Sequence, residues 1–268
     1  MLGSSRSSFA AAREALAERD VASESDLSAE LLAIANALAG SAGLRGALSD
    51  SGTEAAKRVA LARSVFEGKI SSAAMEVLTD LAGRRWNSGS DLVDAVEGLG
   101  FEAALITVEA AGRLDTVEDE LFRIERLIAG DDQLRQALSD RAVEPQAKAE
   151  LMHSLLEGVA DPVTQGLVRQ LVEHPRGRQL GEALTALVEQ SSRRRQHLLA
   201  TVTVAAPISA DHQTRLAAAL GRIYRREIDI QLEIDPEVLG GVKVRIGDEV
   251  IDGSVAHRLE GIRRRLAG

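Results

Sequence analysis

The sequence repeats itself at an interval of 90 residues. The stretch GSAGLRGALSD at 40–50 corresponds to GDDQLRQALSD at 130–140, and Glu67-Gly68 corresponds to Glu157-Gly158 in the same frame. A slip of two residues then aligns Val96-Glu97 with Val188-Glu189. Because a period of 90 residues is too long for a solenoid, the repeat predicts two tandem copies of one small domain.

Both copies have the apolar periodicity of helices. Leucine and isoleucine recur at helical spacing in the first copy and again in the second, as shown by Leu27, Leu31, Ile34 and Leu38 and by Leu121, Ile124, Leu127 and Ile128. We expect further helices near 54–67 and 144–157. Each copy is therefore predicted to be a compact bundle of short helices.

Glycine and proline mark the expected ends of these helices. Gly40, Gly68, Gly130 and Gly158 lie where a helix C-terminus favours a left-handed residue. Pro145 and Pro162 suit the first turn of a helix. These glycine and proline positions agree with the helices that the apolar periodicity predicts in both copies.

The pattern changes after the run Arg193–Arg195. Thr201–Val204 alternates as a half-buried strand does, and Ile228–Ile234 alternates over seven residues. Between these strands we expect a helix capped by Ser209, with Leu216, Leu220 and Ile223 on one face. The connection is long enough for a right-handed parallel crossover.

The acidic and glycine-rich run DPEVLGGVKVRIGDEVIDGSV at 235–255 reads as turns rather than as an active site. A hairpin turn at Gly247-Asp248 pairs Lys243 with Asp252, Arg245 with Val250 and Val244 with Ile251. Asp235-Pro236 ends the preceding strand, Gly240-Gly241 turns the chain back, and Gly253-Ser254 leads into a final helix. These expectations define two tandem all-helical bundles, at 1–99 (the first copy) and 100–197 (the second copy), followed by a small mixed α/β domain with two helices at 198–268.

Composition and motifs argue against several function classes. The net charge is −9, and residues 1–197 carry the whole acidic excess, which does not suit a nucleic-acid partner. There is no cysteine, no phosphate-binding GxxxxGK[ST] loop and no GxSxG nucleophile elbow, and the five histidines are too far apart to form a helical metal pair. No apolar run is long enough for a membrane span. We therefore expect no catalytic residues, no cofactor, no metal and no direct membrane insertion.

The C-terminal run resembles the delta subunit of F-type ATP synthases, the family that includes the oligomycin-sensitivity-conferring protein. The residues that carry the resemblance are Asp235, Pro236, Gly240, Gly241, Gly247, Asp248, Asp252, Gly253 and Ser254. The helical stretches LRGALSD and LRQALSD are similar to this family too, and the doubling of the helical domain resembles the long actinobacterial form.

The resemblance implies a non-catalytic stator that links the catalytic alpha/beta hexamer to the membrane-anchored b stalk and resists rotor torque. The expected partners are the N-terminal helices of the alpha subunits and the C-terminal end of the b subunit. The chain would then be one copy in a hetero-oligomeric complex at the cytoplasmic face of the bacterial cell membrane.

A groove that accepts an amphipathic helix needs apolar side chains at helical spacing. Our candidates for such an alpha-subunit groove are Phe9, Leu16, Met75, Leu78 and Leu81 in the first copy, with Leu105, Val108, Leu167 and Leu171 in the second. For the stalk contact the candidates are Leu259, Ile262 and Leu266 of the final helix. All of these side chains could equally be core, and two other functions stay open: a helix-binding scaffold of an unrelated complex, and an enzyme that uses the acidic turns.

Overall fold

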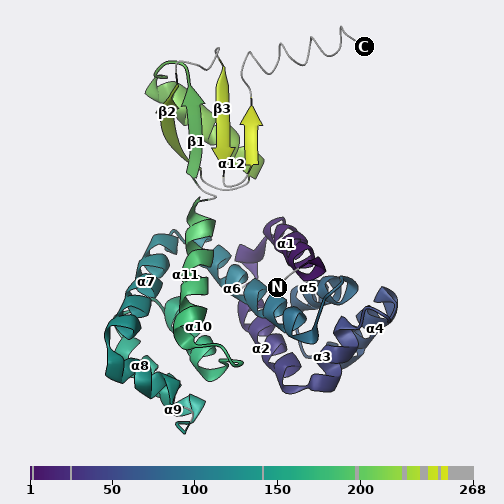
Figure 1. Cartoon of the computed structure of the whole chain (residues 1–268). Helices are drawn as coiled ribbons and strands as arrows, with labels where there is room; N and C mark the ends of the chain where they lie inside the picture. Colours follow the sequence, from purple (N-terminus) through teal and green to yellow (C-terminus); the bar gives the residue numbers. More distant parts are fainter. Residues whose placement is uncertain are drawn as a thin grey trace. The chain divides into compact units, whose positions relative to one another are not determined.

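The computed structural model describes residues 1, 3–24, 26–140, 142–196, 199–224, 228–235, 241–246 and 249–252. The chain divides into two compact units, Met1–Gln190 and Ser191–Gly268. The first unit is built of helices, and the described part of the second contains one sheet (Figure 1). This confirms the predicted fold class, although the expected final helix lies outside the described residues.

The helical elements follow one another with short connections. They are α1 (Ser4–Ala17), the 3-10 helix η1 (Val21–Ser23), α2 (Leu27–Gly40), α3 (Ala42–Ser49), α4 (Ala55–Phe66), α5 (Ser72–Gly83), α6 (Gly89–Ala110), α7 (Leu114–Gly130), α8 (Asp132–Ser139), α9 (Pro145–Leu156), α10 (Pro162–Glu173) and α11 (Leu180–Gln196).

The sequence repeat is also a repeat of structure. Helices α8, α9 and α10 begin and end 90 residues after α3, α4 and α5. The predicted boundary at residues 99 and 100 falls inside α6, which runs unbroken from Gly89 to Ala110. The early part of α6 closes the first copy, and its later part precedes α7 as α1 precedes α2. The division into separate bundles at that boundary stays a prediction.

Two of the four expected glycine caps are confirmed. Gly68 and Gly158 each have a φ of 73°, just after the ends of α4 and α9. The expectation for Gly40 and Gly130 is wrong, because each is the last helical residue of α2 or α7 and neither has a positive φ. The next helix begins so soon that one extended residue, Ser41 or Asp131, ends one helix and caps the following one.

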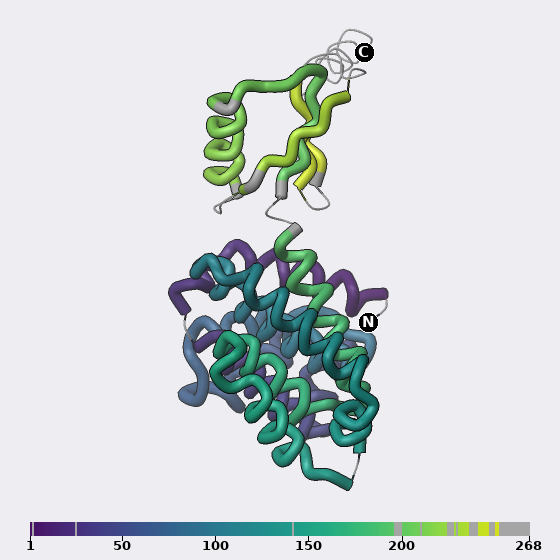
Figure 2. Tube along the Cα trace, turned by 90° about the vertical axis from the view of Figure 1, so that its left-hand side faces the viewer, coloured from purple at the N-terminus to yellow at the C-terminus, as the bar shows by residue number. Residues whose placement is uncertain are grey.

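Helix α6 is the central element of the first unit. It packs against α1, α2, α3 and α5 of the first copy and against α7 and α10 of the second, and both views show it among them (Figures 1 and 2). Its approach to α2 depends on Gly100, where a Cβ would lie 2.8 Å from Leu32 Cδ2. Thirteen of its residues are buried, so α6 contributes to the core along most of its length.

The second unit confirms the predicted β-helix-β connection. Strands β1 (Leu199–Val204) and β2 (Asp229–Ile234) pair in parallel, and α12 (Ala210–Tyr224) joins them on one side of the sheet (Figure 2). Strands β3 (Val242–Ile246) and β4 (Glu249–Asp252) complete the order β2-β1-β3-β4. Ser209 caps α12 through a hydrogen bond from the amide of His212, as expected. Of the three apolar residues expected on one face of α12, Leu220 is buried and Leu216 half-buried, whereas Ile223 is exposed.

The hairpin has the predicted register. Lys243 pairs with Asp252, Val244 with Ile251 and Arg245 with Val250. Val244 and Ile246 face the core of the sheet, whereas Lys243 and Arg245 are exposed. Lys243 and Arg245 therefore lie on the exposed side of a small sheet.

Candidate interaction surfaces

Most residues of the predicted alpha-subunit groove lie inside the helical unit. Phe9 is half-buried, and the other eight are buried: Leu16, Met75, Leu78, Leu81, Leu105, Val108, Leu167 and Leu171. In the chain by itself these eight side chains pack the helices together. A contact with a partner through this set stays a prediction, and a partner could reach it only beside the exposed edges of α1 and α5 or of α6 and α10.

Phe9 is the groove candidate closest to the surface. Its ring lies over α6, with Cζ 2.8 Å from the place where a Cβ on residue 98 would be. Residue 98 is a glycine, so α1 can approach α6 closely enough for the tip of the ring to lie against the helix. The edge between α1 and α6 is thus shaped by one glycine and one aromatic ring.

A buried carboxylate joins the two copies. Glu97 of α6 is 2% exposed and forms ion pairs with Arg176 and Arg178, which follow α10. Arg176 also pairs with Asp94 at 2.9 Å, and its φ of 49° lies in the left-handed region. Burying a carboxylate is costly unless cations and hydrogen bonds compensate it, so this cluster fixes the loop after α10 against α6.

Two further polar contacts link the copies. The side-chain amides of Asn36 on α2 and Gln170 on α10 donate hydrogen bonds to each other, at 3.2 and 2.9 Å. Buried Glu102 on α6 accepts a hydrogen bond from Gln190 Nε2 at 2.8 Å and lies 3.7 Å from the guanidinium of Arg13. Sequence reasoning missed all of these contacts. The only signal was the presence of Glu97 and Glu102 in an otherwise apolar stretch.

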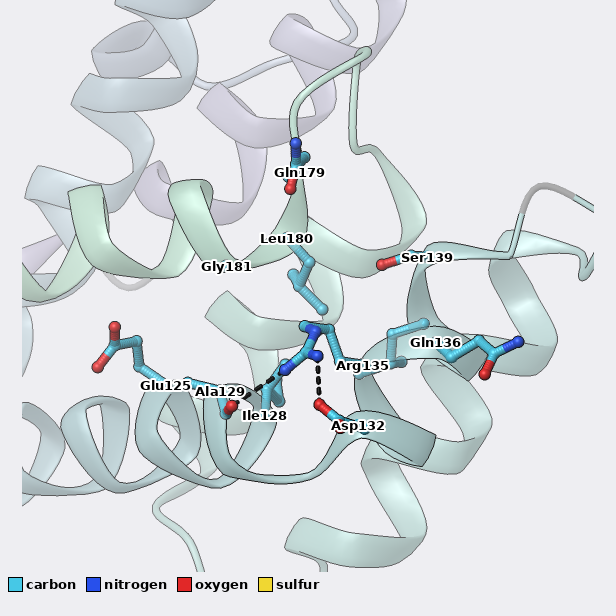
Figure 3. A pocket seen from close by; sticks show the side chains of 11 residues that line it. Glu125, Ile128, Ala129, Asp132, Arg135, Gln136, Ser139, Gln179, Leu180 and Gly181 are labelled. Atoms are coloured by element: carbon cyan, nitrogen blue, oxygen red, sulfur yellow. Dashed lines mark hydrogen bonds and ion pairs between the residues drawn. The ribbon is translucent and has the colours of Figure 1, made fainter.

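A cleft opens in the second copy between α7, α8 and the beginning of α11 (Figure 3). Its volume is about 450 Å³. Ile128, Leu138 and Leu180 supply apolar lining, and Glu125, Asp132 and Arg135 supply charge. The guanidinium of Arg135 donates to the carbonyl of Ala129 at 3.1 Å and to Asp132, so its charge is largely compensated within the chain.

Only part of the C-terminal motif can be located. Asp235 directly follows β2, and its amide donates a 2.9 Å hydrogen bond to the carbonyl of Val204. Gly241 has a φ of 84°, a conformation that a glycine adopts readily, and Asp252 ends β4. All three residues thus lie at or beside strand ends, and their structural role stays a prediction. The remaining motif residues (Pro236, Gly240, Gly247, Asp248, Gly253 and Ser254) and the stalk candidates (Leu259, Ile262 and Leu266) lie outside the described residues.

Asp50 directly follows α3. Hydrogen bonds from the Thr53 hydroxyl and the Gly52 amide hold the pKa of Asp50 below its ordinary value.

Within the described ranges, no group of three or more His, Asp or Glu side chains is arranged to hold a metal ion. No single described helix is long and apolar enough to cross a membrane. The pair α2 and α3 meets that test only together, and it is bent by 106° at its break.

These features define a class of protein: repeated helical units followed by a small mixed α/β unit. A family model described as "ATP synthase delta (OSCP) subunit" matches residues 102–266. The chain is 43% identical to the ATP synthase subunit delta of Streptomyces avermitilis over 268 residues, which cover 99% of this chain and 98% of that one. It is 40% identical to the subunit delta of Streptomyces griseus over the full length of both, and 44% identical to that of Nocardia farcinica over 88% of each.

The chain belongs to the ATP synthase delta (OSCP) subunit family, which confirms the resemblance seen in the C-terminal motif. A chain in the solved structure of the Toxoplasma gondii mitochondrial ATP synthase hexamer is 19% identical, with a TM-score of 0.35, over 64% of this chain and 97% of that chain. That likeness is too weak to support a conclusion about fold or function.

Proposed function

We propose that this chain is the non-catalytic peripheral-stalk subunit that links the alpha/beta hexamer of an ATP synthase to its b stalk. The observation that carries the proposal is the similarity to ATP synthase delta subunits along essentially the whole chain. A stalk of this kind resists the torque of the rotor, so that rotation drives ATP synthesis instead of turning the hexamer. It performs no chemical step itself.

The two units have different partners in this proposal. The helical unit holds N-terminal helices of the alpha subunits at the edges of α1 and α5 or of α6 and α10, beside the groove candidates. The C-terminal unit holds the end of the b subunit, with Leu259, Ile262 and Leu266 as the candidate contacts. An apolar helix face bound in a helical groove is a common mode of protein recognition and suits both contacts.

The family model supports a main role for the second copy. Its match begins at residue 102, within α6, and continues through the second copy and the C-terminal unit. The second copy therefore corresponds to the family's usual helical domain, and the first copy is the addition. In this proposal the chain lies at the cytoplasmic face of the cell membrane as a peripheral part of the complex.

Purification of the tagged chain from detergent-extracted membranes tests this proposal. We expect it to bring down the alpha and b subunits together, one copy of the chain per complex. Crosslinkers placed at the exposed edges of α1 and α10 should reach alpha subunits, and those placed after residue 253 should reach b. Recovery of the chain in an unrelated complex, with the synthase absent, would instead favour the scaffold alternative.

A further inference from the structure

At the place in the first copy that corresponds to the cleft of the second copy, helices α3 and α6 touch. The glycine that begins α6, Gly89, lies against α3: a Cβ there would be 3.2 Å from Arg45 Cγ and 3.4 Å from Ser49 Oγ. The same pattern, glycine followed by leucine and then Val-Glu, recurs as Gly181, Leu184 and Val188-Glu189 in α11. Yet a Cβ on Gly181 would meet nothing within 4 Å.

The difference follows from the way α8 is held. In the first copy α3 packs on α2, α4 and α6, whereas in the second copy α8 packs on α7, and a Cβ on Gly181 at the start of α11 would meet nothing within 4 Å. The connection from the end of α10 to Gly181 is also two residues longer than the connection from the end of α5 to Gly89. This is the two-residue slip in the sequence repeat. Helices that touch in the first copy are therefore separated in the second, and the cleft is the space between them (Figure 3).

The chemistry of the cleft suits one kind of occupant. Ile128, Leu138 and Leu180 offer an apolar lining, and because Asp132 and Arg135 pair with each other, Glu125 leaves the lining with a net negative charge. The helices around the cleft are acidic too: α7, α8 and residues 180–189 of α11 together carry 8 acidic and 3 basic side chains. Complementary charge favours encounter with a basic partner and rejection of an acidic one.

We propose that the cleft between α7, α8 and α11 is a docking site for an amphipathic helix of another ATP synthase subunit, with apolar side chains on one face and Lys or Arg beside them. This site is separate from the groove candidates at α1, α5, α6 and α10. It rests on the proposed function, because the partner must be present in the same complex. Its position explains why the second copy stays open where the first copy is closed by its own helix.

A photo-crosslinking residue at Gln136, in assembled synthase, tests the proposal. Gln136 lines the cleft, and the matched control is Gly46, its exposed counterpart on α3. We expect the probe at 136 to capture a segment of another synthase subunit whose sequence is amphipathic and basic, and the probe at 46 to capture none. Capture of an acidic segment, capture of a second copy of this chain, no capture at 136, or equal capture at both sites would overturn the proposal.

Filling the cleft supplies a second readout. Gly181→Trp places a ring in the open space, and Gly181→Ala is the control that changes the helix without filling the cleft. We expect crosslinking from residue 136 to fall at least about tenfold for the tryptophan variant, the equivalent of about 1.4 kcal/mol, and to be unchanged for the alanine variant. Unchanged crosslinking in both variants would contradict the proposal. If the chain fails to purify with the synthase at all, the proposed function fails. If it purifies normally but residue 136 captures nothing, only the cleft assignment fails.

Discussion

The two copies share a framework but differ in how tightly it is closed. In both, an arginine of the third helix bonds a carbonyl of the preceding helix: Arg45 to Ala39 and Arg135 to Ala129. In both copies, a glutamate carboxylate accepts a hydrogen bond from the backbone amide that begins the fifth helix. Glu30 accepts from Ser71, and Glu120 accepts from Asp161. These hydrogen bonds between neighbouring helices therefore occur at corresponding positions in both copies.

The closing contacts are not duplicated. Buried Arg58 in the first copy bonds the carbonyls of Asp50, Thr53, Ala82, Gly83 and Arg84, and Lys148 takes its place in the second. Exposed large apolar side chains gather in the second copy, at Phe122, Leu127, Val143, Leu151, Leu155 and Val159, whereas Met1 is the one such residue in the described part of the first. The second copy thus lacks contacts that close the first copy, and it has more exposed apolar surface.

The largest expected effect comes from Arg58. Replacement by alanine leaves buried carbonyl groups without donors, so we expect Arg58→Ala to lower the free energy of unfolding by about 3–5 kcal/mol. Lys148→Ala, the matched change in the second copy, should cost less than about 0.5 kcal/mol. Denaturant unfolding followed by fluorescence of Trp86, the single tryptophan, measures the first copy directly. Equal losses of unfolding free energy in Arg58→Ala and Lys148→Ala would contradict the difference in closing contacts between the two copies.

The buried ion-pair cluster should give the next largest effect. Glu97→Gln removes the charge that faces Arg176 and Arg178, and we expect a loss of about 2–4 kcal/mol. Glu189, which aligns with Glu97 after the two-residue slip, is exposed, so Glu189→Gln should change stability by less than about 0.5 kcal/mol. Thermal and denaturant unfolding provide the measurement. A neutral result for Glu97→Gln would show that the copies are held together mainly by apolar packing.

Much of this framework could be predicted from the sequence. Periodicity and the 90-residue repeat located the helices, and Gly247-Asp248 correctly indicated the register of β3 and β4. The groove candidates show what helical spacing alone does not determine. Helical spacing identifies an apolar face such as that of Met75, Leu78 and Leu81, but it does not say whether another helix of the same chain already covers that face. Nor could it reveal Arg58 or Glu97, because their partners are backbone carbonyls and distant arginines brought close only by folding.

Glycine substitutions should have smaller effects, of opposite sign at a closely packed position and at an open one. Gly100→Ala places a Cβ against Leu32 and should destabilise the fold by about 1–3 kcal/mol. Gly166→Ala in α10 meets nothing within 4 Å and should stabilise it by about 0.4–1 kcal/mol. Melting temperatures of the two variants settle the matter. A stabilising Gly100→Ala would mean that α2 and α6 leave room for a Cβ at residue 100, contrary to the 2.8 Å approach of Leu32.

The smallest expected effect is a shift in the titration of Asp50. Its lowered pKa means that its contribution to stability is present above the pKa of the unfolded chain and is lost as the pH falls through the lower folded value. Thr53→Val copies Val143, the residue found in the second copy, and should raise the Asp50 pKa toward its ordinary value. Carbon-detected NMR titration of the carboxyl group measures this, and an unchanged pKa would exclude the Thr53 hydroxyl as the main cause.

The most direct test of the stalk account is ATP-driven proton pumping by inverted membrane vesicles stripped of this chain and then resupplied with it. The account predicts that stripping abolishes pumping while the detached hexamer still hydrolyses ATP, and that the purified chain restores pumping without hydrolysing ATP itself. Vesicles that pump protons at full rate without the chain would contradict it.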